Sequence, residues 1–419
     1  MPHHLQIRAL SFACSCAILG FTSQGQASGF AIPELSIAGI GISNALVANP
    51  EEIGAFAYNP AAMAFHQGSS INLAAIGVAP DLSVKTSSGS HDSRNKDVVG
   101  IPSFFGALRI ADNWTLGLGV GAPFGLETKW RLGTFPTLST PQTSAAHPTK
   151  SKLDMLAITP TVAYRINDNA AISAGVDYYQ AIDLNFNTEA IDIKGDGDGW
   201  GWNLGFLYDL DRISFGVSYR GASELNVEGK FQAFGEAFGP ANGVPIPAKA
   251  NLNLPWRLQA GARYEATDRL ALEFDITRTG WSEFKQIRVR ADGGGLLTTS
   301  TNKWDDANAY RLGLSYQLTP KTLLRFGYTY DKTGQGKDHF SARIPDADRQ
   351  LFSLGVGHNL GDGWGLDAGY MYVLFDDRNY NSSVPFGTYG SDPNGTAAYN
   401  GKYEAHVHLF GLGVTKSFL

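Results

Sequence analysis

The chain has 419 residues, of which 43% are hydrophobic, 12% aromatic and only 17% charged. A soluble chain of this length usually divides into several domains and carries more charge, so this composition with 49 glycines argues against an ordinary soluble enzyme. The net charge is −6 and no basic block is present, which excludes nucleic acid as an expected partner.

Residues 1–27 are predicted to be a secretory signal peptide. Arg8 precedes an apolar core at residues 9–21, and small residues follow at the expected cleavage point. The apolar core is too short to span a bilayer as a helix. Cys14 and Cys16 both lie inside it, so we expect a mature chain without disulfides or thiol chemistry. Lipoprotein processing at Cys14 is an alternative, although it would leave only a stub of the apolar core.

Residues 28–68 are predicted to form a plug, which we call the hatch. The segment is rich in Gly, Ala and Ile, and it includes the run Asn59, Pro60, Ala61. It has few charges and too few bulky side chains to build a hydrophobic core of its own. We therefore expect the hatch to pack inside a larger structure.

Residues 69–419 show the alternation of strands that face two different solvents. Large apolar residues occupy every second position, while glycine and polar residues lie between them, as in the stretches 200–210, 256–265, 324–330 and 364–372. No apolar run after the signal approaches the length of a membrane helix. Because every backbone group in hydrocarbon must be paired, the remaining way to cross a membrane is a closed barrel.

The connections between these strands are predicted to alternate in length. Six short turns fall near residues 112, 168, 210, 267, 319 and 361, and seven longer stretches cover 83–97, 127–151, 187–198, 231–249, 291–303, 332–347 and 378–401. This pattern predicts an all-β membrane protein, an antiparallel outer-membrane barrel of about fourteen strands, with the hatch in its lumen. A soluble all-β protein is the alternative, but it would have to expose many bulky aromatic residues.

The third strand, Trp114 to Leu126, is interrupted by Pro123, Phe124 and Gly125. Proline has no N–H to contribute to a strand ladder, and every strand of a closed barrel has a neighbour on both sides. We therefore expect a local bulge or an inward kink that leaves a gap in the wall. The alternative is that the strand ends before Pro123 and a loop begins there.

Several short motifs, in this order and spacing, resemble the FadL family of outer-membrane transporters for long-chain fatty acids and related hydrophobic compounds. The resemblance covers nearly the whole mature chain. The motifs are Ser28-Gly29-Phe30, Asn59-Pro60-Ala61, residues 197–205, Leu254-Pro255, Trp281-Ser282-Glu283-Phe284, Ala309-Tyr310-Arg311 and residues 344–349.

The resemblance implies a barrel of fourteen strands that the hatch closes at its periplasmic end. It places Phe30 in an interior ligand pocket and makes Asn59, Pro60 and Ala61 part of the hatch signature. It also implies sideways release of the ligand at a kink in strand three, where Pro123, Phe124 and Gly125 lie. The implied function is passive uptake of a fatty acid or an aromatic hydrocarbon, without a cofactor.

Two sets of residues are candidates for ligand contact. Phe231, Phe234 and Phe238, in a predicted outer loop, either capture ligand or pack within the loop. The lumen face carries five arginines beside several acids, and most should be paired across strands. Arg257 or Arg311, if left unpaired, is a candidate partner for a carboxylate.

The sequence gives weaker support for other functions. A surface-adhesion or structural barrel that binds a partner through its outer loops is the main alternative, and a general diffusion porin is another. No motif unites a nucleophile with a base, so we expect no enzyme. His406 and His408 share a strand face but lack a third ligand, so we expect no metal site. We expect a monomer in outer-membrane lipid, inserted by the barrel-assembly machinery that reads the apolar last strand, residues 402–419.

Overall fold

The computed structural model describes residues 29–94, 97–387 and 391–418, with the side chains of residues 237 and 238 excluded. The predicted signal peptide, Ser28 and Leu419 lie outside the described residues. Within the described ranges, no helix has the length and apolar character needed to span a membrane.

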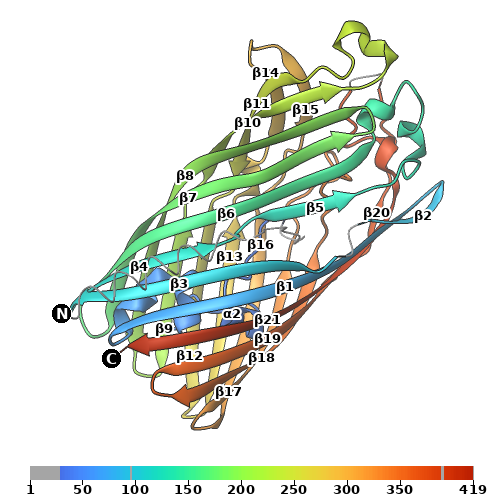
Figure 1. The fold of residues 1–419 in the computed structure, drawn as a ribbon. Helices are drawn as coiled ribbons and strands as arrows, with labels where there is room; N and C mark the ends of the chain where they lie inside the picture. Colours follow the sequence, from blue (N-terminus) through green and yellow to red (C-terminus); the bar gives the residue numbers. More distant parts are fainter. Residues whose placement is uncertain (1–28, 95–96, 388–390, 419) are drawn as a thin grey trace.

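The wall is one antiparallel sheet that closes on itself (Figure 1). Its first strand pairs with its last from Ser69↔Phe418 to Lys85↔Lys402. The wall has fourteen strands, which confirms the predicted fold. Its segments are β1 (Ser69–Thr86), β3 (Val99–Ala111), β4 (Trp114–Gly121) with β5 (Gly125–Lys129), β6 (Pro148–Arg165), β7 (Ala170–Thr188), β8 (Ile191–Leu210), β9 (Ile213–Arg220) with β10 (Ser223–Ala233), β11 (Ile246–Leu254) with β12 (Arg257–Thr267), β13 (Leu270–Thr279) with β14 (Gln286–Ala291), β15 (Leu296–Thr301) with β16 (Ala307–Thr319), β17 (Thr322–Asp331), β18 (Arg349–Gly361), β19 (Trp364–Phe375) and β21 (Gly401–Phe418).

Short elements complete the fold. Two short strands, β2 (Gly89–Asp92) and β20 (Arg378–Tyr380), pair antiparallel with the end of β1 and the start of β21, respectively. The hatch contains α2 (Ile37–Gly41), η1 (Ile53–Ala57) and η2 (Pro60–Phe65), and the connections contain η3 (Pro136–Leu138), η4 (Ser144–Ala146), η5 (Glu236–Ala241), η6 (Trp281–Glu283) and η7 (Ala397–Tyr399).

The two faces of the wall follow the predicted alternation. On β21, the alternate residues Phe410, Leu412 and Val414 are exposed on the outside of the barrel, with Leu412 at 71% exposure. On β8, Trp202 is exposed whereas its neighbour Asn203 is buried. The apolar outer face fits lipid, and the mixed inner face packs against the hatch or lines the lumen.

Two of the predicted long connections are much shorter in the structure than predicted. Residues 187–198 are mostly strand, because β7 ends at Thr188 and β8 begins at Ile191. Residues 291–303 likewise contain β15. Both stretches are rich in Gly, Asp or Thr, which makes strand look like loop in the sequence. The six short turns are present, and together they form the end of the barrel at which both β1 begins and β21 ends.

The glycines of β8 have a packing role instead of a turn role. A Cβ atom on Gly197 would lie 2.3 Å from the carbonyl oxygen of Asn226, and one on Gly195 would lie 2.6 Å from that of Glu228. Both carbonyls belong to β10, which pairs with β8. The sheet therefore bends so tightly between β8 and β10 that its inner face accommodates only glycine at these positions.

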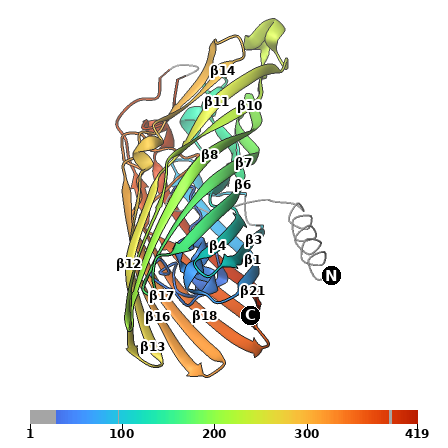
Figure 2. The ribbon, with the colours of Figure 1, turned by 90° about the vertical axis from the view of Figure 1, so that its left-hand side faces the viewer.

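The hatch lies inside the barrel, toward the end with the short turns (Figure 2). A Cβ on Gly327 of β17 would come within 2.6 Å of Ser43, and one on Gly216 of β9 would come 1.9 Å from the Val47 carbonyl oxygen. The helix α2 packs on β17, β18, β19 and β21. The hatch backbone thus approaches glycines of the wall closely, which fits its prediction as a plug.

The connections at the other end pack together as a cap. Their buried aromatic and apolar cluster joins the 130–147, 332–348 and 376–400 connections, and its members include Trp130, Phe135, Leu138, Phe340 and Tyr399. Phe135 and Leu138 are fully buried there. His147 packs beside this cluster, with its ring 5.5 Å from that of Phe135.

Acid should loosen the cap through His147. Burial lowers the pKa of His147 to about 4, and the nearby Arg343 and His91 also disfavour its charge. The folded cap favours the neutral ring of His147. Its contribution to the stability of the cap is therefore complete above about pH 6.5 and is lost as the pH falls toward 4. At pH 5 the loss is about 2 kcal/mol. Hydrogen exchange of residues 130–147, corrected for intrinsic rates, should rise at pH 5, and His147→Phe should abolish that rise. Equal pH dependence in both proteins would contradict this assignment.

Candidate functional site

The third wall strand is kinked where the sequence predicts. β4 ends at Gly121 opposite Ala157, and β5 begins at Gly125 opposite Asp154. Residues 122–124 therefore lie opposite only two residues of β6, which is a bulge. The strand resumes after Pro123, so the alternative of a loop that begins there is wrong.

The bulge opens one edge of the sheet. β3 pairs with β4 only from Phe104 onward, whereas its residues 99–103 pair with β1 alone. β5 pairs with β6 and, within the described residues, forms no ladder with β3. A gap in the ladder thus separates residues 99–103 from β5.

The start of the hatch attaches to this kink. The Gly125 N–H donates to the Phe30 carbonyl oxygen at 2.9 Å, and the Ile32 N–H donates to the Pro123 carbonyl oxygen at 2.8 Å. On the other side, the Gly29 N–H donates to Asp346 at 3.1 Å. The backbone of residues 30–32 is therefore held against the kink, and any displacement of that backbone must break these hydrogen bonds.

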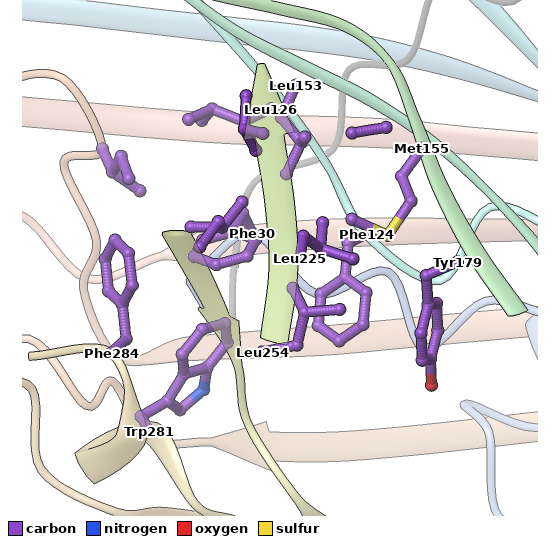
Figure 3. Close-up of a cluster of buried hydrophobic side chains, with 14 of the residues drawn as sticks. Phe30, Phe124, Leu126, Leu153, Met155, Tyr179, Leu225, Leu254, Trp281 and Phe284 are labelled. Carbon is purple, nitrogen blue, oxygen red and sulfur yellow. The ribbon is translucent and has the colours of Figure 1, made fainter. Parts of the chain in front are cut away.

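Phe30 is the centre of a buried aromatic cluster (Figure 3). Its ring lies 4.9 Å from that of Trp281, 5.1 Å from that of Phe284 and 5.8 Å from that of Phe124. Tyr179 extends the cluster beyond Phe124 at 6.3 Å. Phe30 is therefore held between the kink of strand three and the turn that carries Trp281 and Phe284.

Gly29 must lack a side chain for this arrangement. Its φ is +66°, and a Cβ atom would lie 2.3 Å from the ring of Trp304 and 2.8 Å from that of Trp281. The sequence analysis singled out Phe30 and its neighbour Phe124. It gave no site role to Trp281 and Phe284, which come from a motif, residues 281–284, whose position in the barrel was not predicted.

A cavity lies against Phe30 on the side of the cap. It has about 790 Å³ of space between protein atoms, including its open mouth. Its walls come from β5–β8, β10, β11 and β14 and are mostly apolar, including Leu126, Leu153, Leu252, Phe284 and Val289. We call it the upper cavity. An aliphatic chain there would be shielded from water, which is worth about 0.8 kcal/mol for each methylene group.

A second cavity lies at the kink itself, and we call it the lower cavity. It has about 530 Å³ of space and is lined by Pro123, Val120 and Gly121 of the kinked strand and by Leu35 and Met63 of the hatch. Phe30 lines only the upper cavity, whereas Pro123 lines only the lower one. The segment that joins Phe30 to the kink therefore lies between the two.

The arginines of the lumen are mostly neutralised by acids. Arg220 contacts Asp177 at 2.5 Å, and Arg263 contacts Glu51 at 2.7 Å. Arg325 bridges Glu52 of the hatch at 2.5 Å and Asp367 of β19 at 2.7 Å. The prediction that most lumen arginines are paired is confirmed. Two of them, Arg263 and Arg325, pair with hatch acids, although the sequence suggested partners on neighbouring strands.

Arg257 differs from these arginines. Among the described residues, its guanidinium makes no hydrogen bond or ion pair, although Arg220 lies directly opposite on the neighbouring strand. Arg311, the other candidate, donates to the Thr277 hydroxyl at 2.5 Å, and its Nε has no partner in the described structure. Because Asp177 neutralises Arg220, the charge of Arg257 is the uncompensated one of this pair.

The three residues of the hatch signature have structural roles. Asn59 donates to the carbonyl oxygens of Val47 at 2.8 Å and of Phe206 in β8 at 2.9 Å, and it accepts from the Ala61 N–H. It is the N-cap of η2, and Pro60 occupies the first turn of that helix. These contacts attach the later part of the hatch to β8, whereas Phe30 lies at the start of the hatch.

Burial and ion pairing act in opposite directions on the acids of the hatch. Burial raises the pKa of Glu34, and the charge of Arg349 and a hydrogen bond from Asn44 offset only part of that rise. Burial also disfavours the charge of Glu52, but the charge and hydrogen bonds of Arg325 outweigh it and lower the pKa of Glu52. Glu52 is therefore an ionised clamp between the hatch and the wall.

The predicted loop phenylalanines do not form one surface. Phe231 lies in β10 and is buried against Ile193 and Val289, whereas Phe234 is exposed. The side chain of Phe238 lies outside the described part of the chain. Within the described ranges, no group of three His, Cys, Asp or Glu side chains is placed to hold a metal ion.

Sequence comparison finds relatives that match over nearly their full length. The chain is 24% identical over 430 residues to the 47 kDa outer membrane protein of Pasteurella multocida, covering 96% of this chain and 97% of that protein. It is 22% identical over 455 residues to the long-chain fatty acid transport protein of Escherichia coli, covering 97% and 98%.

Solved structures share the fold. A Pseudomonas aeruginosa FadL homologue aligns with a TM-score of 0.79 at 19% identity, covering 93% of this chain and all of that one. The Pseudomonas putida toluene transporter TodX aligns with a TM-score of 0.69 at 17% identity, covering 91% and 99%. The model of the family described as "Outer membrane protein transport protein (OMPP1/FadL/TodX)" matches residues 18–418. The kinked, plugged barrel therefore belongs to this family of the outer membrane, as the sequence motifs predicted.

Proposed function

We propose that this protein takes up hydrophobic small molecules passively across the outer membrane, and that its preferred ligands carry a carboxylate. The observation that supports this most strongly is the apolar upper cavity beside Phe30, which provides a path without water for a chain that an open porin would exclude. The names of the relatives, a long-chain fatty acid transport protein and a toluene transporter, agree with a hydrophobic ligand. None of these names is that of an enzyme, and we infer a transport role without catalysis.

The path runs from the upper cavity to the lower cavity past Phe30. The Phe30 ring packs against Phe124 of the kink, and the backbone beside it is hydrogen-bonded to Pro123 and Gly125, so a ligand that displaces residues 30–32 also disturbs the kink. The lower cavity then lies beside the ladder gap between β3 and β5. We infer that the ligand leaves the barrel sideways through this gap into the hydrocarbon of the membrane, so that it never enters water.

Arg257 supports the choice of a carboxylate. Its guanidinium is uncompensated by any acid among the described residues, and it lies next to the paired Arg220, which lines the lower cavity. A carboxylate at Arg257 would gain a charge-assisted bidentate hydrogen bond. Its aliphatic chain would then extend along the aromatic cluster into the upper cavity.

Replacement of Arg257 tests the preference for a carboxylate. In Arg257→Met, binding of a long-chain fatty acid to the purified protein should weaken by about 10- to 100-fold, since a hydrogen bond to a charged group contributes about 1.5–3 kcal/mol. Binding of the corresponding neutral alkane should change by less than about 3-fold, because dispersion contacts remain. Arg257→Lys should recover part of the affinity. Equal losses for both ligands, or no loss, would show that Arg257 does not receive the carboxylate.

Ion conductance separates this function from that of a general porin. With the hatch clamped by Glu52 and Asn59, the protein in planar bilayers should carry almost no current. A steady open conductance in the unmodified protein would contradict the proposed function. We further propose that the protein works as a monomer in outer-membrane lipid after insertion by the barrel-assembly machinery.

A further inference from the structure

The wall has a second break, on the edge of β11 that faces β14. β11 pairs with β10 along its whole length, from Ser223↔Leu254 to Phe231↔Ile246. On its other edge it pairs with β14 only at Ala248↔Ala291 and Lys249↔Arg290. Regular pairing resumes with Arg257↔Thr279. Residues 250–255 are left without a ladder on that edge, which is about 20 Å of strand at about 3.3 Å per residue.

The opposite lip of this break is the stretch 281–289. It comprises η6, whose turn carries Trp281 and Phe284 inward against Phe30, and the first residues of β14. In the described structure, one hydrogen bond joins the two lips, from the Asn253 side chain to the Glu283 carbonyl oxygen at 3.3 Å. The lower end of the break is closed by a hydrogen bond, which the Gly280 N–H donates to the Trp256 carbonyl oxygen at 2.8 Å.

The upper cavity reaches this break from inside. Ala250, Asn251 and Leu252 of one lip line the cavity, and so do Phe284, Ile287 and Val289 of the other. Unpaired backbone groups in a barrel wall are tolerated where they line a cavity or face water. A break whose two lips line the same cavity is therefore consistent with a passage through the wall.

The break begins at the level of an outer aromatic belt. Trp202, Tyr219 and Trp256 form a row on neighbouring strands, with ring centres 5.2 Å and 6.2 Å apart. Such belts mark the interface between hydrocarbon and headgroups. β10, β11, β14 and β15 continue beyond this level to the far end of the barrel (Figure 1). The break therefore opens at the headgroup layer of the outer leaflet.

The outer surface of the β14 lip is basic. Lys285, Arg288 and Arg290 are exposed there, and Glu283 is the one acid between residues 281 and 290. Among the described side chains, those of Lys285 and Arg288 form no ion pair, whereas Lys249 across the break is paired with Glu228 and Asp292. The β3 lip of the strand-three gap, residues 99–103, has no charged residue. The two breaks thus differ in chemistry.

We propose that the break between β11 and β14 is a lateral inlet, through which an amphiphilic carboxylate held in the outer leaflet passes into the upper cavity. Lys285 and Arg288 attract its carboxylate at the outer lip. Arg257 receives that group inside, because it lies one residue beyond the lower end of the break, and the aliphatic chain follows into the cavity. This inference rests on the proposed function and adds the route by which the ligand arrives.

A cross-link across the break tests the inlet. Asn253→Cys and Glu283→Cys are combined in a chain in which Cys14 and Cys16 are replaced by Ala, and a short bismaleimide joins them. The control joins Leu258→Cys to Arg278→Cys, which are register partners in the intact β12–β13 ladder. The readout is the rate at which a fluorescent long-chain fatty acid, added to the membrane of proteoliposomes, binds to the protein.

The inlet predicts that the cross-link at the break slows binding at least 10-fold, whereas the control cross-link changes it less than 2-fold. Ligand loaded before cross-linking should stay bound, which shows that the cavity is intact. Equal rates in the two cross-linked proteins would overturn the inlet. The same double-cysteine protein before cross-linking reports whether it folds and binds. Absence of binding in the unmodified protein would reject the proposed function instead, so the two failures are distinguishable.

The basic lip is tested separately by Lys285→Gln combined with Arg288→Gln. At low salt this variant should bind the fatty acid about 3- to 10-fold more slowly, and the difference should shrink at high salt because the ions screen the attraction. The binding rate of a neutral long-chain alcohol should be unchanged. A salt-independent loss, or an equal loss for the alcohol, would show that the lip does not attract the carboxylate by charge.

Discussion

Replacement of Pro123, Phe124 and Gly125 by Val, Thr and Val is expected to reduce uptake of a long-chain fatty acid at least 10-fold while the barrel still folds. The change restores an N–H donor and strand-forming residues at the bulge, so that strand three can pair with β3 along residues 99–103. Closure of that ladder removes the gap beside the lower cavity. The measurement is uptake of labelled fatty acid by cells that depend on this protein, at matched amounts of protein in the outer membrane.

Two controls separate closure of the gap from other effects. Phe124→Thr alone removes the ring that contacts Phe30 and leaves the bulge in place. The triple change of residues 322–324 to Val, Thr and Val places the same side chains in β17, which is paired on both sides. Both controls should retain far more uptake than the repaired kink. Full uptake through a repaired kink would reject lateral release.

Replacement of Phe30 by Ala is expected to weaken fatty-acid binding about 10- to 100-fold. The ring forms part of the surface of the upper cavity, and full burial of a phenylalanine side chain contributes about 1.5–3 kcal/mol. Its removal also loosens Trp281 and Phe284, which pack against its edge. Isothermal titration with the purified protein measures the effect.

Phe65→Ala is the matched control, because Phe65 is a hatch phenylalanine that packs against Arg165 and lines neither cavity. It should leave the affinity within about 2-fold of that of the unmodified protein. Removal of residues 28–30 should reproduce the loss seen with Phe30→Ala. An affinity that is unchanged in both of these variants would show that Phe30 does not form part of the binding site.

The large features of the fold could be predicted because each depends on a local pattern. Alternation on β8 and β21 indicates two faces, and the proline at residue 123 indicates a bulge wherever it falls in a strand. The hatch was predictable because a segment that is poor in both charge and bulk cannot fold alone. In each case the feature can be predicted from side chains that are neighbours in the sequence, and no contact with a distant part of the chain is needed.

The predictions that failed depend on curvature and register. Gly195 and Gly197 look like loop residues, yet they lie in a strand because the neighbouring backbone approaches within 2.3–2.6 Å of their missing Cβ atoms. Arg257 and Arg311 were equivalent candidates in the sequence, and the structure separates them because Arg311 donates a hydrogen bond to the Thr277 hydroxyl. The second break was not predicted, since Trp281 and Phe284 form a motif whose inward direction is set by strands far away in the sequence.

In the function that we propose, a hydrophobic carboxylate binds inside the barrel, between Phe30 and the apolar walls of the upper cavity. A crystal structure of the protein with a fatty acid brominated at its terminal carbon would locate the ligand, because bromine gives an unambiguous anomalous peak. We predict the peak inside the upper cavity, near Leu126, Leu252 and Phe284, with the carboxylate at Arg257. Bromine found only among the outer connections or on the lipid-facing wall would contradict the account.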